Sequence, residues 1–215
     1  MQFYVDNFGL FRDAFLTTLS LSLLGGLLAL VLGTLLAAFR VSPITPLRGL
    51  ATFYVETFRN TPLTVVFFFI IFGLPQIDFV IGFFPGAVLA IGLYTAAFVC
   101  EAVRSGINAV ASGQAEAARA LGLTFGQSLR EVVLPQAFRT VVPPLGNVLL
   151  AMVKNTSIAA GFAVSELSSL LPRLVNANAG ELVLVLIGVV VGYMLITVPS
   201  AFALHRVERR VAILR

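Results

Sequence analysis

The chain has 215 residues, of which 59% are hydrophobic and 11% are charged, and its formal net charge is +4. Soluble domains contain about half apolar and about a quarter charged residues, so this composition excludes an ordinary soluble domain and predicts a polytopic membrane protein. A single His and a single Cys cannot form a catalytic dyad or a metal site, and the cationic excess indicates membrane topology rather than nucleic-acid binding.

Five apolar segments have about the 20 residues that a helix needs to cross a bilayer. They are residues 14–39, 53–74, 84–103, 140–165 and 182–204. We therefore expect an all-α membrane protein in which residues 1–215 form a single transmembrane domain with five helices.

The distribution of arginine predicts the orientation, because cytoplasmic loops are enriched in Lys and Arg. If the N-terminus is outside, the arginines on the inner side are Arg40, Arg48, Arg104, Arg119, Arg130, Arg139, Arg206, Arg209, Arg210 and Arg215. Only Arg12 and Arg173 then lie on the outer side. We expect an external N-terminus and a cytoplasmic C-terminus. The start of the chain lacks the basic balance of a signal peptide, so we expect no cleavage.

The first span carries Gly25, Gly26 and Gly33. Small residues let a neighbouring helix approach closely in lipid. We therefore expect these glycines to serve helix packing.

Charged and polar side chains enter the second span. Glu56 and Arg59 are three residues apart and can pair on one helical face, while Thr57, Thr61 and Thr64 form a second polar stripe. Ionisable groups at membrane depth are costly and normally pair or face a cavity. An ion pair at the cytoplasmic end of the span and a polar cavity wall both remain open interpretations.

The third span places Tyr94, Phe98 and Glu101 at positions i, i+4 and i+7, on one face of a helix. A carboxylate at this depth needs a partner, which Arg104 can supply one turn later. Helix packing and a ligand site are both compatible with this stripe.

Residues 112–135 form a polar interruption between apolar spans. Ser112 or Gly113 can cap a short helix that has Glu116 in its first turn, and Gly122 can end it in the left-handed conformation. A second helix is predicted at Thr124, because Gln127 follows it in the spacing of a capping box. Neither helix can cross a bilayer, so we expect a cytoplasmic helix–turn–helix that docks in a groove on another protein.

The fourth span contains Pro143 and Pro144, which remove backbone donors and predict a break in the helix. Broken helices are tolerated in lipid where they line a cavity. The polar run from Lys154 to Ser157 follows this predicted break. We expect it to line a cavity.

The final span carries Gly188 and Gly192. Their Gly-x-x-x-Gly spacing favours close helix contact. We expect this span to serve assembly.

A family resemblance links these features. Glu116, Ala117, Ala118, Gly122, Val132, Leu134 and Pro135 resemble the EAA loop of ABC importer permeases, with Val132 where Ile is usual. Residues 58–75 resemble the FRGTP-type segment of the permeases that take up polar amino acids. Residues 94–107, 154–157 and Glu166 match three further segments of the same family, so the resemblance extends from Thr17 to Val207.

This resemblance implies a type I ABC importer permease fold, with five transmembrane helices and a cytoplasmic coupling helix. It assigns contact with the ATPase to Glu116, Ala117, Ala118, Arg119, Leu121 and Gly122. Together with the polar stripes above, it makes the following residues candidates for substrate binding: Thr57, Arg59, Thr61, Tyr94, Phe98, Glu101, Lys154, Asn155, Ser157 and Glu166.

The implied function is the permease subunit of an ATP-driven importer of a polar amino acid in the bacterial cytoplasmic (inner) membrane. The implied partners are two copies of an ATP-binding subunit, a second permease that is identical or related, and an external solute-binding protein. A phosphate-binding loop needs Gly-Lys before Ser or Thr, whereas the one lysine, Lys154, follows Val153. We therefore expect ATP and Mg²⁺ in the partner ATPase, and no cofactor, metal or catalytic residue in this chain.

The polar and charged side chains of the spans favour a zwitterionic solute, with Glu101 as ligand for its ammonium group. The surplus of positive charge suggests glutamate or glutamine, although the external binding protein alone could determine the choice. The alternative is a secondary transporter or channel for small polar solutes, but five spans do not divide into the usual inverted repeats. An intramembrane enzyme lacks the reactive groups that it would need.

Overall fold

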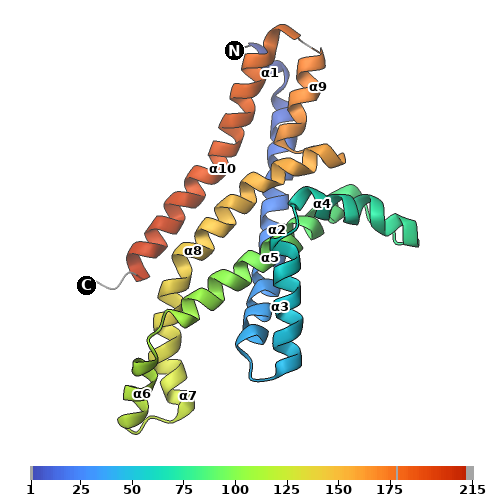
Figure 1. The fold of residues 1–215 in the computed structure, drawn as a ribbon. Coiled ribbons are helices and arrows are strands. Elements are labelled where there is room, and N and C mark those ends of the chain that lie inside the picture. Colours follow the sequence, from blue (N-terminus) through green and yellow to red (C-terminus); the bar gives the residue numbers. More distant parts are fainter. Residues whose placement is uncertain (1, 178, 212–215) are drawn as a thin grey trace.

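The computed structural model describes residues 2–177 and 179–211, and in this part of the chain every regular element is helical (Figure 1). Arg215, which the orientation argument used, lies outside the described residues. The α-helices are α1 (Gln2–Asp6), α2 (Phe8–Val41), α3 (Thr45–Arg59), α4 (Leu63–Phe68), α5 (Phe83–Asn108), α6 (Ser112–Ala120), α7 (Phe125–Gln127), α8 (Leu134–Asn155), α9 (Leu170–Ala177) and α10 (Leu182–Val211). Shorter helical turns of π or 3₁₀ type are Phe69–Gly73, Leu74–Ile77, Ser128–Val133, Thr156–Phe162, Leu167–Ser169 and Ala179–Glu181.

Three of the described helices, α2, α5 and α10, are long and apolar enough to cross a bilayer unaided. The other two predicted spans are bent pairs: Thr45–Arg59 with Leu63–Ile77, at 105°, and Ser128–Phe162 with Leu167–Ala177, at 44°. The all-α membrane fold is therefore confirmed, but the second predicted span is not straight. Its bend lies at Pro62, whose extended backbone (ψ 139°) cannot continue the helix.

The predicted break at Pro143 and Pro144 is wrong. Both prolines lie inside α8, which continues to Asn155. Each proline ring holds φ near the helical value and removes one backbone N–H donor, and the helix accommodates both losses in this position. The chain turns further along, where Ala163 has a left-handed backbone (φ 58°).

Helices α2 and α5 form the most extensive contact in the described chain, and glycine makes their close approach possible. A Cβ atom at Gly33 would lie 2.6 Å from the side chain of Val99, and one at Gly92 would lie 2.5 Å from Leu28. The predicted packing role of Gly33 is confirmed. At the other end of the fold, a Cβ at Gly188 of α10 would lie 2.5 Å from the ring of Phe11.

The buried core lies where α2, α4, α5 and the turn after α8 meet. Its centre is the ring of Phe67, stacked on Phe162 with centroids 4.8 Å apart. Outward faces remain apolar, as in Leu23 and Val31 of α2 and Val190 of α10, which are all exposed. Exposed apolar faces on long helices are stable in lipid and not in water, so the fold agrees with a membrane environment.

Residues 112–133 fold as a hairpin at one end of the helix bundle, opposite the N-terminus (Figure 1). Gly122 has φ +85°, and the N–H groups of Gly122 and Leu123 donate to the carbonyls of Arg119 and Ala118. This pair of bonds is a Schellman motif and confirms the predicted glycine stop.

The capping box of the second helix is also confirmed. The N–H of Thr124 donates to Oε1 of Gln127 at 2.9 Å, and the N–H of Gln127 donates to Oγ1 of Thr124 at 3.4 Å. The predicted cap of the first helix is wrong, because α6 begins at Ser112 after Ala111, which makes no side-chain cap bond. Glu116 consequently lies in the second turn of α6. The extended backbone of Ala111 (ψ 132°) starts the helix there without a polar cap.

Candidate functional site

The outer surface of the hairpin is exposed. Glu116, Ala117 and Arg119 are exposed on α6, and Leu121 at its end is 85% exposed. Ala118 instead is buried and packs inside the hairpin. Of the six predicted coupling residues, four therefore lie outward, Ala118 supports the hairpin from within, and Gly122 makes its turn.

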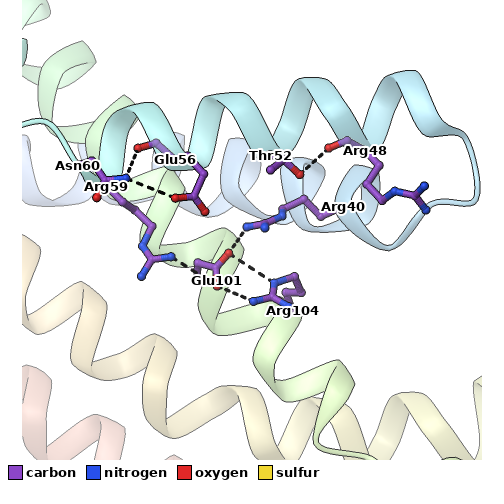
Figure 2. Close-up of polar contacts among 8 residues, drawn as sticks. All are labelled: Arg40, Arg48, Thr52, Glu56, Arg59, Asn60, Glu101 and Arg104. Carbon is purple, nitrogen blue, oxygen red and sulfur yellow. Dashed lines mark hydrogen bonds and ion pairs between the residues drawn. The ribbon is translucent and has the colours of Figure 1, made fainter.

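A charge cluster joins helices α2, α3 and α5. The carboxylate of Glu101 on α5 contacts three guanidinium groups: Arg40 of α2, Arg59 of α3 and Arg104 of α5 (Figure 2). Nη2 of Arg104 lies 2.8 Å from Oε2 of Glu101, and Nη1 of Arg59 lies 3.7 Å from the same oxygen. Arg40 hydrogen-bonds to Oε1.

The structure confirms one predicted ion pair and contradicts another. Glu101 and Arg104 pair one turn apart, as expected. Glu56 makes no ion pair with Arg59 among the described residues; it accepts a hydrogen bond from Asn60 at 3.3 Å instead. Arg59 turns towards Glu101 because α3 packs beside α5, which carries this less exposed carboxylate. The contact of Arg40 was not predicted, because 61 residues separate it from Glu101.

A pocket of about 160 Å³ lies between α5 and α8, and Phe98 in its wall precedes Glu101 by three residues on α5. Three predicted site residues line it, namely Tyr94, Phe98 and Asn155. The rings of Tyr94 and Phe98 lie 5.0 Å apart, and the rest of the wall is formed by Thr95, Val148, Ala151 and Met152. Sequence reasoning missed these four residues, since their types carry no signal of ligand contact.

Two larger hollows have a smaller share of polar groups in their walls than the pocket between α5 and α8. One, of about 490 Å³, lies between the first turns of α2 and the middle of α10. The other, of about 610 Å³, lies between α2, α8 and α10. Their walls are almost entirely apolar, which suits lipid chains and not a charged amino acid.

The remaining substrate-binding candidates lie elsewhere. The hydroxyl of Thr57 in α3 donates to the carbonyl of Phe53 at 2.7 Å, and that of Thr61, two residues beyond the end of α3, donates to the carbonyl of Thr57 at 2.8 Å. Lys154 is exposed and Ser157 half-buried, and neither lines the pocket between α5 and α8. Helical periodicity alone could not decide which neighbour each of these side chains faces.

Glu166 is fully buried and forms bonds within the protein. Its carboxylate accepts hydrogen bonds from Oη of Tyr193 at 2.5 Å, from the N–H of Ser168 at 2.7 Å and from Oγ1 of Thr18 at 3.3 Å. Oγ1 of Thr18 in turn accepts from the N–H of Leu167 at 3.1 Å. Glu166 therefore ties α2 to α10 in this structure, and it does not line the pocket between α5 and α8.

Comparison with known proteins gives concordant matches. The family of binding-protein-dependent transport system inner membrane components matches residues 29–213. The glutamate transport system permease protein GluC of Corynebacterium glutamicum is 42% identical over 212 residues, covering 93% of each chain. The probable glutamine ABC transporter permease protein GlnM of Bacillus subtilis is 38% identical, covering 95% of this chain and 94% of its own.

A solved structure shows the same arrangement of helices. It is described as the crystal structure of an amino acid ABC transporter with histidines, and it matches with a TM-score of 0.88. The identity is 32%, and 96% of each chain is covered.

Proposed function

The chain belongs to the family of binding-protein-dependent transport system inner membrane components, and from this premise we propose that its solute is an acidic or amide amino acid, glutamate or glutamine. It is a multi-pass permease subunit of an importer in the inner membrane, and it works with an ATPase and a binding protein. The likeness to glutamate and glutamine permeases at 42% and 38% identity supports the choice of solute.

The observation that carries the proposal is the pocket between α5 and α8 with the charge cluster one helical turn away. Tyr94 and Phe98 offer apolar faces to the carbon chain of an amino acid, and Asn155 offers a donor and an acceptor. The nearby cluster has more cations than anions, which favours a solute that carries at least one carboxylate.

The proposed assembly has two permease chains, identical or related, and two copies of the ATP-binding subunit. Each α6–α7 hairpin lies in a groove of one ATPase, with Leu121 as its apolar anchor. ATP and Mg²⁺ are bound by that partner, the chain itself has no catalytic residue, and the external binding protein delivers the solute. The arginine distribution supports a cytoplasmic hairpin and C-terminus and an external N-terminus.

Uptake of radiolabelled amino acids by cells that carry the complete transporter tests the choice of solute. L-glutamate or L-glutamine should be taken up in an ATP-dependent way, and an excess of the unlabelled compound should abolish that uptake. L-arginine and L-leucine serve as comparison solutes. Uptake of either of them in preference to glutamate and glutamine would contradict the proposal.

A further inference from the structure

The three arginines of the charge cluster differ in their exposure and in their distance from Glu101. Arg40 is the most enclosed, with its side chain 14% exposed, and Arg104 lies at hydrogen-bond distance. Arg59 is 40% exposed, and its nearest nitrogen is 3.7 Å from the carboxylate, too far for a hydrogen bond. Arg59 is therefore the arm of the cluster that is most open and most weakly held.

The cluster also has unbalanced charge. Three guanidinium groups surround one carboxylate, and counting Glu56 on the neighbouring turn of α3 still leaves one positive charge in excess. A guanidinium partly enclosed by protein favours an anionic partner, and its planar fork suits a carboxylate that can bind through both oxygens. Glu101 cannot offer such a geometry to all three arginines at once.

The cluster lies within reach of the pocket. Glu101 follows Phe98 by three residues on the same face of α5, which is about 4.5 Å along the helix axis. An amino acid held against Tyr94 and Phe98 would thus have the cluster at one end and Asn155 across the pocket.

We propose that Arg59 exchanges partners during transport. It releases the carboxylate of Glu101 and binds a carboxylate of the transported amino acid instead. This inference rests on the proposed function and deepens it, because it assigns the solute's carboxylate to one side chain. Arg40 and Arg104 keep Glu101 neutralised throughout, so the cluster is never without a carboxylate. Glu101 then acts as a competitor for Arg59 and not as a ligand for the ammonium group.

The test measures equilibrium binding to the purified permease–ATPase complex in lipid nanodiscs, without the external binding protein. The probes are L-glutamate, L-glutamine and L-glutaminamide, of which the last has no carboxylate. The parent complex should prefer L-glutamine to L-glutaminamide. Arg59→Gln should remove this preference and weaken L-glutamine binding roughly tenfold to hundredfold, the range for a lost hydrogen bond to a charged group. Arg59→Lys should restore part of the loss.

Arg48→Gln is the matched control, because Arg48 lies on the exposed side of α3, apart from the cluster (Figure 2). It should bind all three probes as the parent does. A general loss of fold would affect L-glutaminamide as much as L-glutamine, so the preference between them separates a binding role from a structural one.

Glu101→Gln distinguishes the exchange from the ammonium-ligand interpretation. If Glu101 competes for Arg59, this variant should bind L-glutamine at least as tightly as the parent, whereas loss of binding would overturn the inference. If Arg59→Gln still prefers L-glutamine to L-glutaminamide as the parent does, the inference is also overturned. If the Glu101→Gln complex does not assemble, this comparison of Arg59→Gln with the parent decides by itself. A parent complex that binds none of the three probes would overturn the inference, whereas the proposed function is refuted only by the uptake measurement described above.

Discussion

Oη of Tyr193 donates a hydrogen bond of 2.5 Å to the carboxylate of Glu166, across the contact between α10 and the turn that precedes α9. Glu166 is fully buried, so this bond and those from Ser168 and Thr18 replace the water that a carboxylate otherwise requires. The network connects the first and last long helices of the fold.

Tyr193→Phe should therefore destabilise the permease. Loss of one partner from a buried polar group costs about 1–3 kcal/mol. We expect a lower thermal midpoint of the purified protein. Thr18→Val should act in the same direction, since Thr18 both donates to Glu166 and accepts from Leu167.

Thr17→Val is the matched control for this network, because the Thr17 hydroxyl bonds, among the described residues, to the carbonyl of Asp13 in its own helix alone. Its thermal midpoint should stay close to that of the parent. A Tyr193→Phe protein as stable as Thr17→Val would show that the network contributes nothing.

Gly33→Ala should disrupt the pairing of α2 and α5. The added Cβ would lie 2.6 Å from the side chain of Val99 and 2.7 Å from the carbonyl oxygen of Ala96, and a backbone atom cannot rotate away. Overpacking of this kind costs about 1–3 kcal/mol. Gly49→Ala on the exposed side of α3 meets nothing within 4 Å and should be neutral or stabilising. Thermal midpoints of the two variants, measured side by side, check this expectation.

Gly122→Val should uncouple transport from ATP hydrolysis. The left-handed backbone costs a residue with a side chain at least about 1–2 kcal/mol, although the space around Gly122 is open. Uptake should fall while the external binding protein binds its solute as before. Gly126→Ala, on the following helix and equally open, should transport normally. Parent-level uptake by Gly122→Val would argue against a role for the turn in coupling.

Leu121→Asp should weaken attachment of the ATPase. Leu121 is 85% exposed at the end of α6, and burial of such a side chain in a partner contributes about 1.5–3 kcal/mol. The amount of ATPase that copurifies with the permease should decrease severalfold. Undiminished copurification would place the anchor elsewhere on the hairpin.

Asn155→Ala should impair uptake, because Asn155 is the polar side chain of α8 that lines the pocket beside Tyr94 and Phe98. We expect severalfold slower uptake from the loss of one or two hydrogen bonds to the solute. Ser157→Ala is the control: Ser157 belongs to the same polar run but does not line this pocket. Equal uptake by both variants would remove Asn155 from the site.

The features that the sequence alone determined are local. Apolar segments of membrane-spanning length, the stop at Gly122, the capping box of Thr124 and Gln127 and the pair of Glu101 with Arg104 each depend on residues within a few turns of one another. The physical interactions that produce them, namely backbone hydrogen bonds and partition into lipid, are complete within one segment.

The partners of the polar side chains were decided only by the tertiary structure. Arg59 could reach Glu56 on its own helix, but it turns to Glu101 because α3 packs on α5 and the half-buried carboxylate attracts cations more strongly than an exposed one. Glu166 was expected at a substrate site, yet the approach of α2 and α10 surrounds it with Thr18 and Tyr193. A sequence specifies which groups need partners, whereas the packing of helix faces determines which partners they obtain.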